Sequence, residues 1–208
     1  MPSESNQTYY PLTSTVIFRT LQKIIEGKDS VAQITEAISE KEQNVWVYVK
    51  ILGDEDLIVI ESREEDKRIK KYTPNMRGIL SFYLKWVDAN RPLKEKDKDQ
   101  FLSNKSFTNE FDWYIEKQLP KLRVENLERA FLSFSTNLIM NYKTRQTLRE
   151  SFRVQAAEGK TKLEDVVKKI EREIQNLSSI NEILSSVVFG GPNLTNKLPD
   201  NSYPGVKL

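Results

Sequence analysis

The 208-residue sequence contains no cysteine and no histidine. Disulfides, thiolate zinc sites and catalysis by a thiol or an imidazole are therefore excluded. The stretch EGKT at 158–161 lacks the earlier glycine of a phosphate-binding loop, because Val154 holds that place, and it follows a predicted helix rather than a strand. We interpret it as a turn between helices. The chain is accordingly expected to be no enzyme and to use no metal and no cofactor.

Long apolar runs are also missing. No run approaches the roughly 18 residues that a membrane-spanning helix needs, and the polar start of the chain does not resemble a signal peptide. We therefore expect a cytoplasmic protein without a membrane partner. Neither sign of charge is in clear excess, since 32 basic residues stand against 30 acidic ones. Any surface for nucleic acid must come from local clustering of basic residues.

Two helical patterns follow residues 1–12, which are expected to be flexible. Thr13 or Ser14 is placed to cap the first helix, and Asp29 or Ser30 is placed to cap the second. The apolar residues behind each cap follow the three-and-four spacing of one buried helix face. The chain is thus predicted to begin with two short amphipathic helices.

The stretch EKEQNVWVYVKILGDEDLIVI fits two structures. Its valines alternate with aromatic and charged residues as in a half-buried strand, and β-branched residues favour strands. The positions of Val45, Val49 and Leu52 instead fit one face of a helix. We expect a helix, because a strand here would leave the second helix without its partner. Ser39 and Glu42, in the polar turn before it, have the spacing of a capping box.

A β-hairpin is predicted next. Residues 57–62 and 67–73 have strand-like composition and are joined by the charged turn at 63–66. Pro74 ends the second strand. A helix follows, and its inward positions are Ile79, Phe82, Tyr83 and Trp86.

Residues 13–90 resemble the archaeal and bacterial winged helix-turn-helix regulators of the MarR and PadR kind. The resemblance is carried by VAQITEAIS as second helix, by VWVYVKILGDEDLI as third helix running into a strand, and by RIKKYTPNMRGIL closing the hairpin into a helix. In such families the third helix ends four residues before Gly-Leu-Ile, and Asp56 stands where that glycine usually is. The resemblance implies that the third helix contacts DNA bases and that the hairpin, called the wing, contacts the phosphate backbone.

Candidate DNA-binding residues follow from that arrangement. Glutamine and asparagine can pair with adenine, lysine can reach guanine or phosphate, and aromatic rings can lie against a sugar or a thymine methyl. The candidates on the third helix are Gln43, Asn44, Trp46, Tyr48 and Lys50, and those on the wing are Arg63, Lys67, Arg68 and Lys70.

Two observations favour other interpretations. Exposed tryptophan and tyrosine are typical of protein interfaces, and lysines also protect edge strands from aggregation. Residues 1–92 carry 13 basic and 14 acidic side chains, a net charge of −1.

The second half of the sequence is predicted to be helical. Residues 107–119 form one helical segment that Pro120 ends, and residues 124–157 form a long helix with a strong apolar face, Leu127, Phe131, Phe134 and Leu138. The predicted organisation is a winged-helix domain at 13–90, a connecting region with a short helix at 91–123, two long helices at 124–188 and a flexible tail at 189–208. The expected fold class is mainly α-helical with a small β-hairpin.

The last long helix carries a four-heptad seam with alternating steps of four and three. Its positions are Leu163, Val167, Ile170, Ile174, Leu177, Asn181, Leu184 and Val188. Asn181 would pair with its twin in a parallel coiled-coil homodimer. Alternatively, the helix folds back on residues 124–157 as a hairpin within one chain. Both can hold if two such hairpins pair as a four-helix dimer.

A row of arginines precedes the seam. Arg145, Arg149 and Arg153 recur every four residues and fit either an acidic partner or nucleic acid, or a solvated face that pairs with nearby acids such as Glu150. The sequence predicts a dimeric DNA-binding protein, a transcriptional regulator whose partners are double-stranded DNA and a second copy of itself. The alternative is a winged-helix interaction or architectural protein, serving segregation, replication or viral assembly. It would bind a protein through its third helix and oligomerise through its C-terminal helices.

Overall fold

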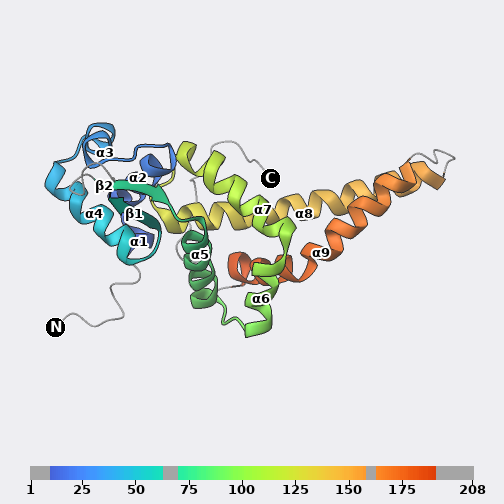
Figure 1. Ribbon diagram of the computed structural model, residues 1–208. Coiled ribbons are helices and arrows are strands. Elements are labelled where there is room, and N and C mark those ends of the chain that lie inside the picture. The colour runs from blue at the N-terminus through green and yellow to red at the C-terminus, as the bar shows by residue number, and fades with distance from the viewer. Residues whose placement is uncertain (1–9, 63–69, 158–162, 191–208) are drawn as a thin grey trace. The chain divides into compact units, whose positions relative to one another are not determined.

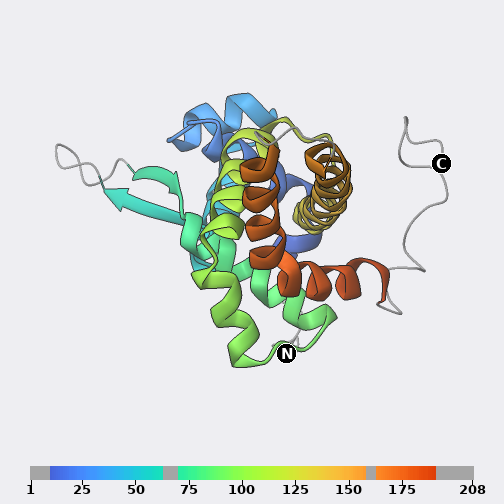
Figure 2. The ribbon, with the colours of Figure 1, turned by 90° about the vertical axis from the view of Figure 1, so that its right-hand side faces the viewer.

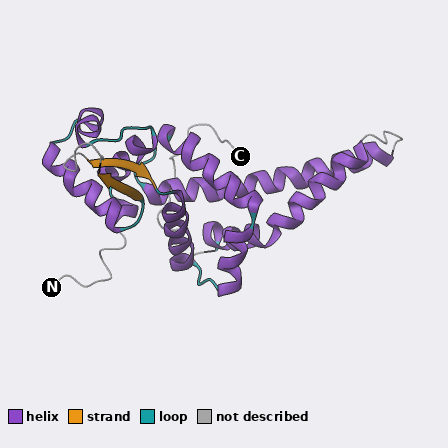
Figure 3. Ribbon diagram, viewed as in Figure 1, coloured by secondary structure: helices purple, strands orange, loops and turns teal. Residues whose placement is uncertain are grey.

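The computed structural model describes residues 10–62, 70–157 and 163–190. Within these ranges the chain is mainly helical and its strands form one antiparallel hairpin, as the sequence predicts (Figure 3). The chain forms two compact units. The first contains the described residues up to 86 together with 107–134, and the second contains 87–106 together with the described residues from 135 onward. No helix in the described ranges is long and apolar enough to cross a membrane.

The first unit begins with helices and a hairpin in the predicted order, apart from an additional short helix at its start (Figure 1). Residues 10–12 were expected to be flexible, but they are helical, and Pro11 and Leu12 are buried. These elements are α1 (Tyr10–Thr13), α2 (Thr15–Ile25), α3 (Val31–Ile38), α4 (Glu42–Asp54), β1 (Ile58–Ser62), β2 (Lys70–Pro74) and the start of α5 (Met76–Asn90). Its remaining elements are α7 (Lys105–Trp113), the π-helical turn η2 (Tyr114–Gln118), the 3₁₀ turn η3 (Leu119–Lys121) and the start of α8 (Leu127–Ala157). The predicted helix at 107–119 is therefore confirmed, with irregular turns before the break.

Serine side chains begin the first two predicted helices. The hydroxyl of Ser14 accepts a hydrogen bond from the backbone N–H of Ile17 (3.4 Å), and that of Ser30 accepts one from Gln33 (3.5 Å). The capping box predicted at Ser39 and Glu42 is wrong. Ser39 ends α3 in the left-handed conformation (φ 56°), so it cannot also take the extended backbone that an N-cap needs.

Helix α4 replaces the strand that its valines favour, so the helical prediction is confirmed. Val45, Val49 and Leu52 are completely or almost completely buried, and α4 packs against α2 and α3. The burial of three branched side chains on one face outweighs the intrinsic preference of valine for strands. Tertiary packing decides the secondary structure of this segment.

The hairpin pairs Ile58 with Pro74 at one end and Ser62 with Lys70 at the other. It projects sideways from the helices of the first unit (Figure 2). Its base is anchored because the N–H of Tyr72 donates to the carbonyl of Asp29 (3.0 Å), in the loop before α3. The register places Tyr72 inward, where it is 2% exposed, and burial raises the pKa of its phenol.

The core of the first unit is aromatic. Tyr83 of α5 lies edge-on to Phe131 and Phe134 of α8, with ring centroids 5.2 and 5.6 Å apart, and Phe107 and Phe111 of α7 complete the cluster. Such tilted and edge-to-face pairs are the favourable geometry for aromatic rings. The inward faces predicted for residues 74–90 and 124–138 are confirmed by this cluster.

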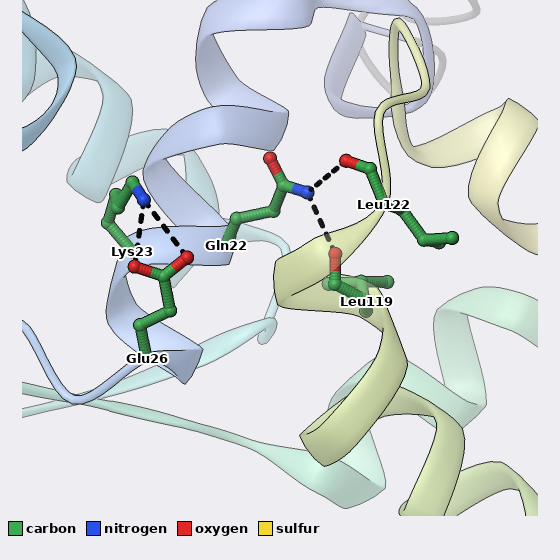
Figure 4. A network of polar contacts seen from close by, with 5 residues as sticks. All are labelled: Gln22, Lys23, Glu26, Leu119 and Leu122. Carbon is green, nitrogen blue, oxygen red and sulfur yellow. Dashed lines mark hydrogen bonds and ion pairs between the residues drawn. The ribbon is translucent and has the colours of Figure 1, made fainter.

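A buried glutamine ties α2 to the end of η3 (Figure 4). The side-chain amide nitrogen of Gln22 donates to the carbonyls of Leu119 (2.8 Å) and Leu122 (3.1 Å). The carbonyl of Leu119 also accepts a hydrogen bond from the backbone N–H of Leu122 (3.2 Å), so Gln22 adds a second donor to this turn. Gln22 thereby fixes residues 119–122 to the N-terminal helices.

The second unit contains α6 (Glu95–Ser103), the rest of α8 and α9 (Glu164–Phe189). Polar side chains link α6 to α9. Gln100 donates to the hydroxyl of Ser179, and the amide of Asn104 donates to the carbonyl of Asn176 (2.6 Å).

Helix α9 folds back beside α8 within one chain (Figure 1). Two ion pairs join them, Arg145–Glu173 (3.6 Å) and Arg153–Glu171 (3.2 Å). The seam positions Val167, Ile174, Leu177, Leu184 and Val188 are buried in the chain itself, and Leu163, Ile170 and Asn181 are half-buried. The hairpin interpretation of the seam is the one the structure adopts. Most seam residues are therefore buried within one chain, and the pairing of two such hairpins as a dimer stays a prediction.

Candidate nucleic-acid interface

The outer face of α4 is the centre of the candidate site. Gln43, Asn44, Trp46 and Lys50 are exposed, as predicted from the helical phase, whereas Tyr48 is half-buried. Val47 is exposed as well, at 54%. The amide nitrogen of Asn44 donates to the carboxylate of Glu40 (3.2 Å), so its side chain is held near the start of the helix. The exposed face thus combines two amides, two apolar side chains and one lysine.

An apolar groove of about 720 Å³ lies between α4 and the hairpin. Most of its lining is apolar, with a few charged side chains. The lining residues are Trp46, Val47, Val49, Lys50, Gly53, Asp54, Ile58, Ile60, Lys70 and Tyr72. Gly53 lets the hairpin approach, because a Cβ atom there would lie 2.8 Å from Cδ1 of Ile60. Trp46 (44%) and Ile60 (43%) are large apolar side chains that are exposed at this groove.

Charge is sparse on the described part of this face. Lys50 is exposed at the groove, and the ammonium of Lys70 donates to the hydroxyl of Ser62 across the hairpin (2.8 Å). Asp54 stands on the same groove. The wing residues Arg63, Lys67 and Arg68 lie outside the described residues. The structure therefore brings Trp46 and Lys50 of α4 to the same groove as Lys70, whereas Gln43, Asn44 and Tyr48 do not line it.

The groove itself is a feature that the sequence did not predict. Ile58, Ile60 and Gly53 were not among the candidate residues. The available signal was the single glycine near the end of a predicted helix, since an isolated helical glycine often marks a close approach of another segment. Which segment approaches depends on the position of the hairpin, and that position follows from tertiary packing.

The arginine row of α8 belongs to the second unit and is engaged with acids. Arg145 and Arg153 pair with Glu173 and Glu171 of α9, and Arg149 contacts Glu150 (2.5 Å). This arrangement agrees with the predicted pairing with nearby acids.

No protein-family model matches the chain, and no curated protein or solved structure is detectably similar to it.

Proposed function

We propose that residues 13–90 form a winged helix-turn-helix domain and that the chain is a homodimeric DNA-binding protein that regulates transcription. The supporting observation is the placement of α4. It buries one face on α2 and α3 and turns Gln43, Asn44 and Lys50 outward beside a projecting hairpin. A helix held in this way is the element that enters the major groove in helix-turn-helix proteins.

The backbone at Asp56 supports the same assignment. Asp56 occupies the place of the usual glycine after the third helix, and its φ is +59°, a value that glycine adopts without strain. A positive φ at this place supports the proposal, although the residue differs and α4 ends at Asp54, two residues before it.

Each part of the site has a distinct role in this proposal. Asn44 and Gln43 pair with adenine edges, Lys50 reaches guanine or phosphate, and Trp46 with Val47 contacts thymine methyl groups. Lys70 contacts the phosphate backbone, together with Arg63, Lys67 and Arg68. Phosphate contacts supply affinity for any sequence, whereas base contacts supply the discrimination.

The proposal is tested by the salt dependence of binding to random and to selected duplex DNA. Replacing Lys70 by alanine should weaken both DNAs equally and reduce the slope of log K against log salt by about 0.9, as expected for one lost phosphate contact. Replacing Asn44 or Lys50 by alanine should cost about 1–3 kcal/mol on the selected sequence and little on random DNA.

Lys169→Ala is the matched control, since Lys169 is an exposed lysine of α9 in the other unit. It should leave both affinities unchanged. Absence of salt-dependent binding to any duplex by the wild type would refute the proposed function. An equal loss on both DNAs for Asn44→Ala would instead reassign that side chain to backbone contact.

A second candidate function is supported by the apolar groove. Exposed Trp46, Val47 and Ile60 on a face with few cations are typical of a protein interface. In that case this groove binds an apolar segment of a partner protein. Trp46→Ala would then abolish partner binding, and the wild type would show no salt-dependent affinity for DNA.

A further inference from the structure

The second half of α8 has an uncharged outer face. Along it Met140, Thr144, Thr147, Ser151 and Val154 recur in steps of four, three, four and three, so they lie in one row. All five are exposed, Met140 at 52% and Val154 at 61%. Nearly a third of the residues in the chain are charged, and yet this row carries no charge over four turns.

The hydroxyls in the middle of the row are used within the helix. Thr144 donates to the carbonyl of Met140 (2.9 Å), and Thr147 donates to the carbonyl of Lys143 (3.2 Å). Both threonines therefore have their donors satisfied and can offer methyl groups to a neighbouring surface. Leu148, which is 42% exposed, widens the row on one side.

Helix α9 lies on another side of α8 and does not cover the row. Its ion pairs with α8 are made by Arg145 and Arg153, through Glu173 and Glu171. Arg149, between those two arginines, is two residues from Thr147 and hence about 200° around the helix. The middle of the row is thus left open by these ion pairs, while the last residue of α9, Phe189, reaches one edge of the row beside Lys143.

One edge of the row carries two opposite charges. Lys143 is four residues before Thr147 and Glu150 is three residues after it, which places both about 40–60° to the same side of Thr147. Glu150 contacts Arg149 through Oε1, and a carboxylate accepts hydrogen bonds at both oxygens. The Lys143 ammonium lies 5.6 Å from the ring centroid of Phe189, which is itself 58% exposed and adds apolar area at this edge.

This pattern is complementary to itself. A two-fold axis through Thr147, perpendicular to α8, brings each residue opposite the one equally far on the other side of Thr147. Met140 then faces Val154, seven residues to either side. Such an axis keeps each edge of the helix on its own side of the interface. Lys143 of one copy therefore lies beside Glu150 of the second copy. Measured along the helix, the two residues differ in height by about 1.5 Å, the rise of one residue.

We propose that α8 pairs antiparallel with α8 of a second copy of this chain, centred on Thr147. The apolar row forms the contact, and two symmetric Lys143–Glu150 pairs set its direction. The occupant is a second copy rather than a foreign protein because methyl groups, apolar ends and charges all match under one two-fold axis. The pairing rests on the homodimer of the proposed function but not on its DNA binding. A monomeric wild type would overturn the pairing and the homodimer together, whereas loss of salt-dependent DNA binding would leave the pairing untouched.

Charge reversal tests the pairing with the full-length chain. Lys143→Glu or Glu150→Lys alone puts like charges opposite each other twice and should raise the dimer dissociation constant by about tenfold or more. An equimolar mixture of the two variants should form a heterodimer about as tight as the wild-type dimer, measured by light scattering over a dilution series. Restoration in the mixture shows that both variants are folded. Arg172→Glu, on the exposed side of α9, is the control with an equal charge change and should have no effect.

A cross-link gives a second measurement. The chain has no cysteine, so Thr147→Cys introduces a single thiol on the proposed axis. Oxidation should convert it to a covalent dimer, because a disulfide forms only where the two Cα atoms come within about 7 Å. Arg172→Cys should remain uncross-linked. A monomeric wild type, single charge reversals without effect, or no cross-link at residue 147 would each overturn the proposal.

Discussion

Asp56 has a backbone conformation that most side chains avoid. Its φ of +59° lies in the left-handed region, where aspartate and asparagine are tolerated better than other residues. The amide nitrogen of Asn75 donates to its carboxylate (2.8 Å) and holds the turn. Close by, Gly78 lies against the backbone carbonyl of Asp56. One turn thus depends on two residues that the chain places 22 positions apart.

Substitutions at the two positions should differ greatly in cost. A Cβ atom on Gly78 would overlap the carbonyl oxygen of Asp56, which is backbone and cannot rotate away. Gly78→Ala should therefore lower the free energy of unfolding by about 2 kcal/mol or more. Asp56→Gly should change it by less than about 1 kcal/mol, because relief of the left-handed conformation offsets the lost hydrogen bond. Urea unfolding measures both.

Gly27→Ala separates the overlap from a simple backbone effect. Gly27 has a φ of 96°, and no atom lies within 4 Å of the place where its Cβ would stand. Its substitution should cost only the conformational term, about 1 kcal/mol. If Gly78→Ala costs no more than Gly27→Ala, the close approach of Asp56 does not constrain this turn.

At the scale of single elements, the sequence predicts the helices best where a cap and an apolar face agree. Ser14 and Ser30 cap their helices, and the apolar residues behind them are buried. The start of a helix is predicted less well where the apolar face alone indicates it. The long helix expected from residue 124 begins at Leu127, because the side chain of Asn126 accepts a hydrogen bond from the N–H of Arg129 (3.0 Å) and so provides the cap.

The candidate site was predicted only in part, for a physical reason. Helical phase alone orients Asn44, Trp46 and Lys50 outward, so the exposed face of α4 could be predicted. The groove beside it could not, because it needs the hairpin to pack against Gly53 and Val49. Strand alternation gives the faces of a hairpin and not the surface it approaches.

The start of α4 offers a prediction of its own. Lys41 is its N-cap and makes no side-chain hydrogen bond to the helix. Lys41→Ser should supply that hydrogen bond and raise the free energy of unfolding by about 1 kcal/mol. Lys41→Ala is the control, since alanine removes the same lysine and cannot cap. Equal stabilities of the serine and alanine variants in urea unfolding would mean that the missing cap costs α4 nothing.

At the scale of the whole molecule, the two units do not follow the order of the chain. Residues 107–134 pack with the N-terminal helices, through the aromatic cluster around Tyr83 and through Gln22. Apolar periodicity predicts that the face with Phe131 and Phe134 is buried. It does not indicate that α5 is the partner, because any apolar surface would satisfy the same pattern.

The seam of α9 shows the same limit. A heptad pattern requires an apolar partner surface but does not specify whether that surface belongs to the same chain. Here the ion pairs Arg145–Glu173 and Arg153–Glu171 link α9 to its own α8, and most seam residues are buried within the chain. Asn181 then has no twin across a parallel seam. Its Oδ1 is buried and has no hydrogen-bond partner among the described residues.

Asn181 therefore decides between the two uses of the seam. An unpaired buried carbonyl oxygen costs on the order of 1–3 kcal/mol, so Asn181→Leu should raise the free energy of unfolding by an amount in that range. Because the seam is covered within the chain, light scattering should give the variant the same molar mass as the wild type at each concentration. A parallel coiled coil requires the opposite, since loss of its buried asparagine relaxes the choice of oligomer and gives trimers or tetramers. Asn181→Ala, which removes the amide without adding apolar volume, should stabilise less than leucine. A variant of higher mass than wild type would show that the seam is shared between chains, and the hairpin of α8 and α9 would then be a state that dimerisation replaces.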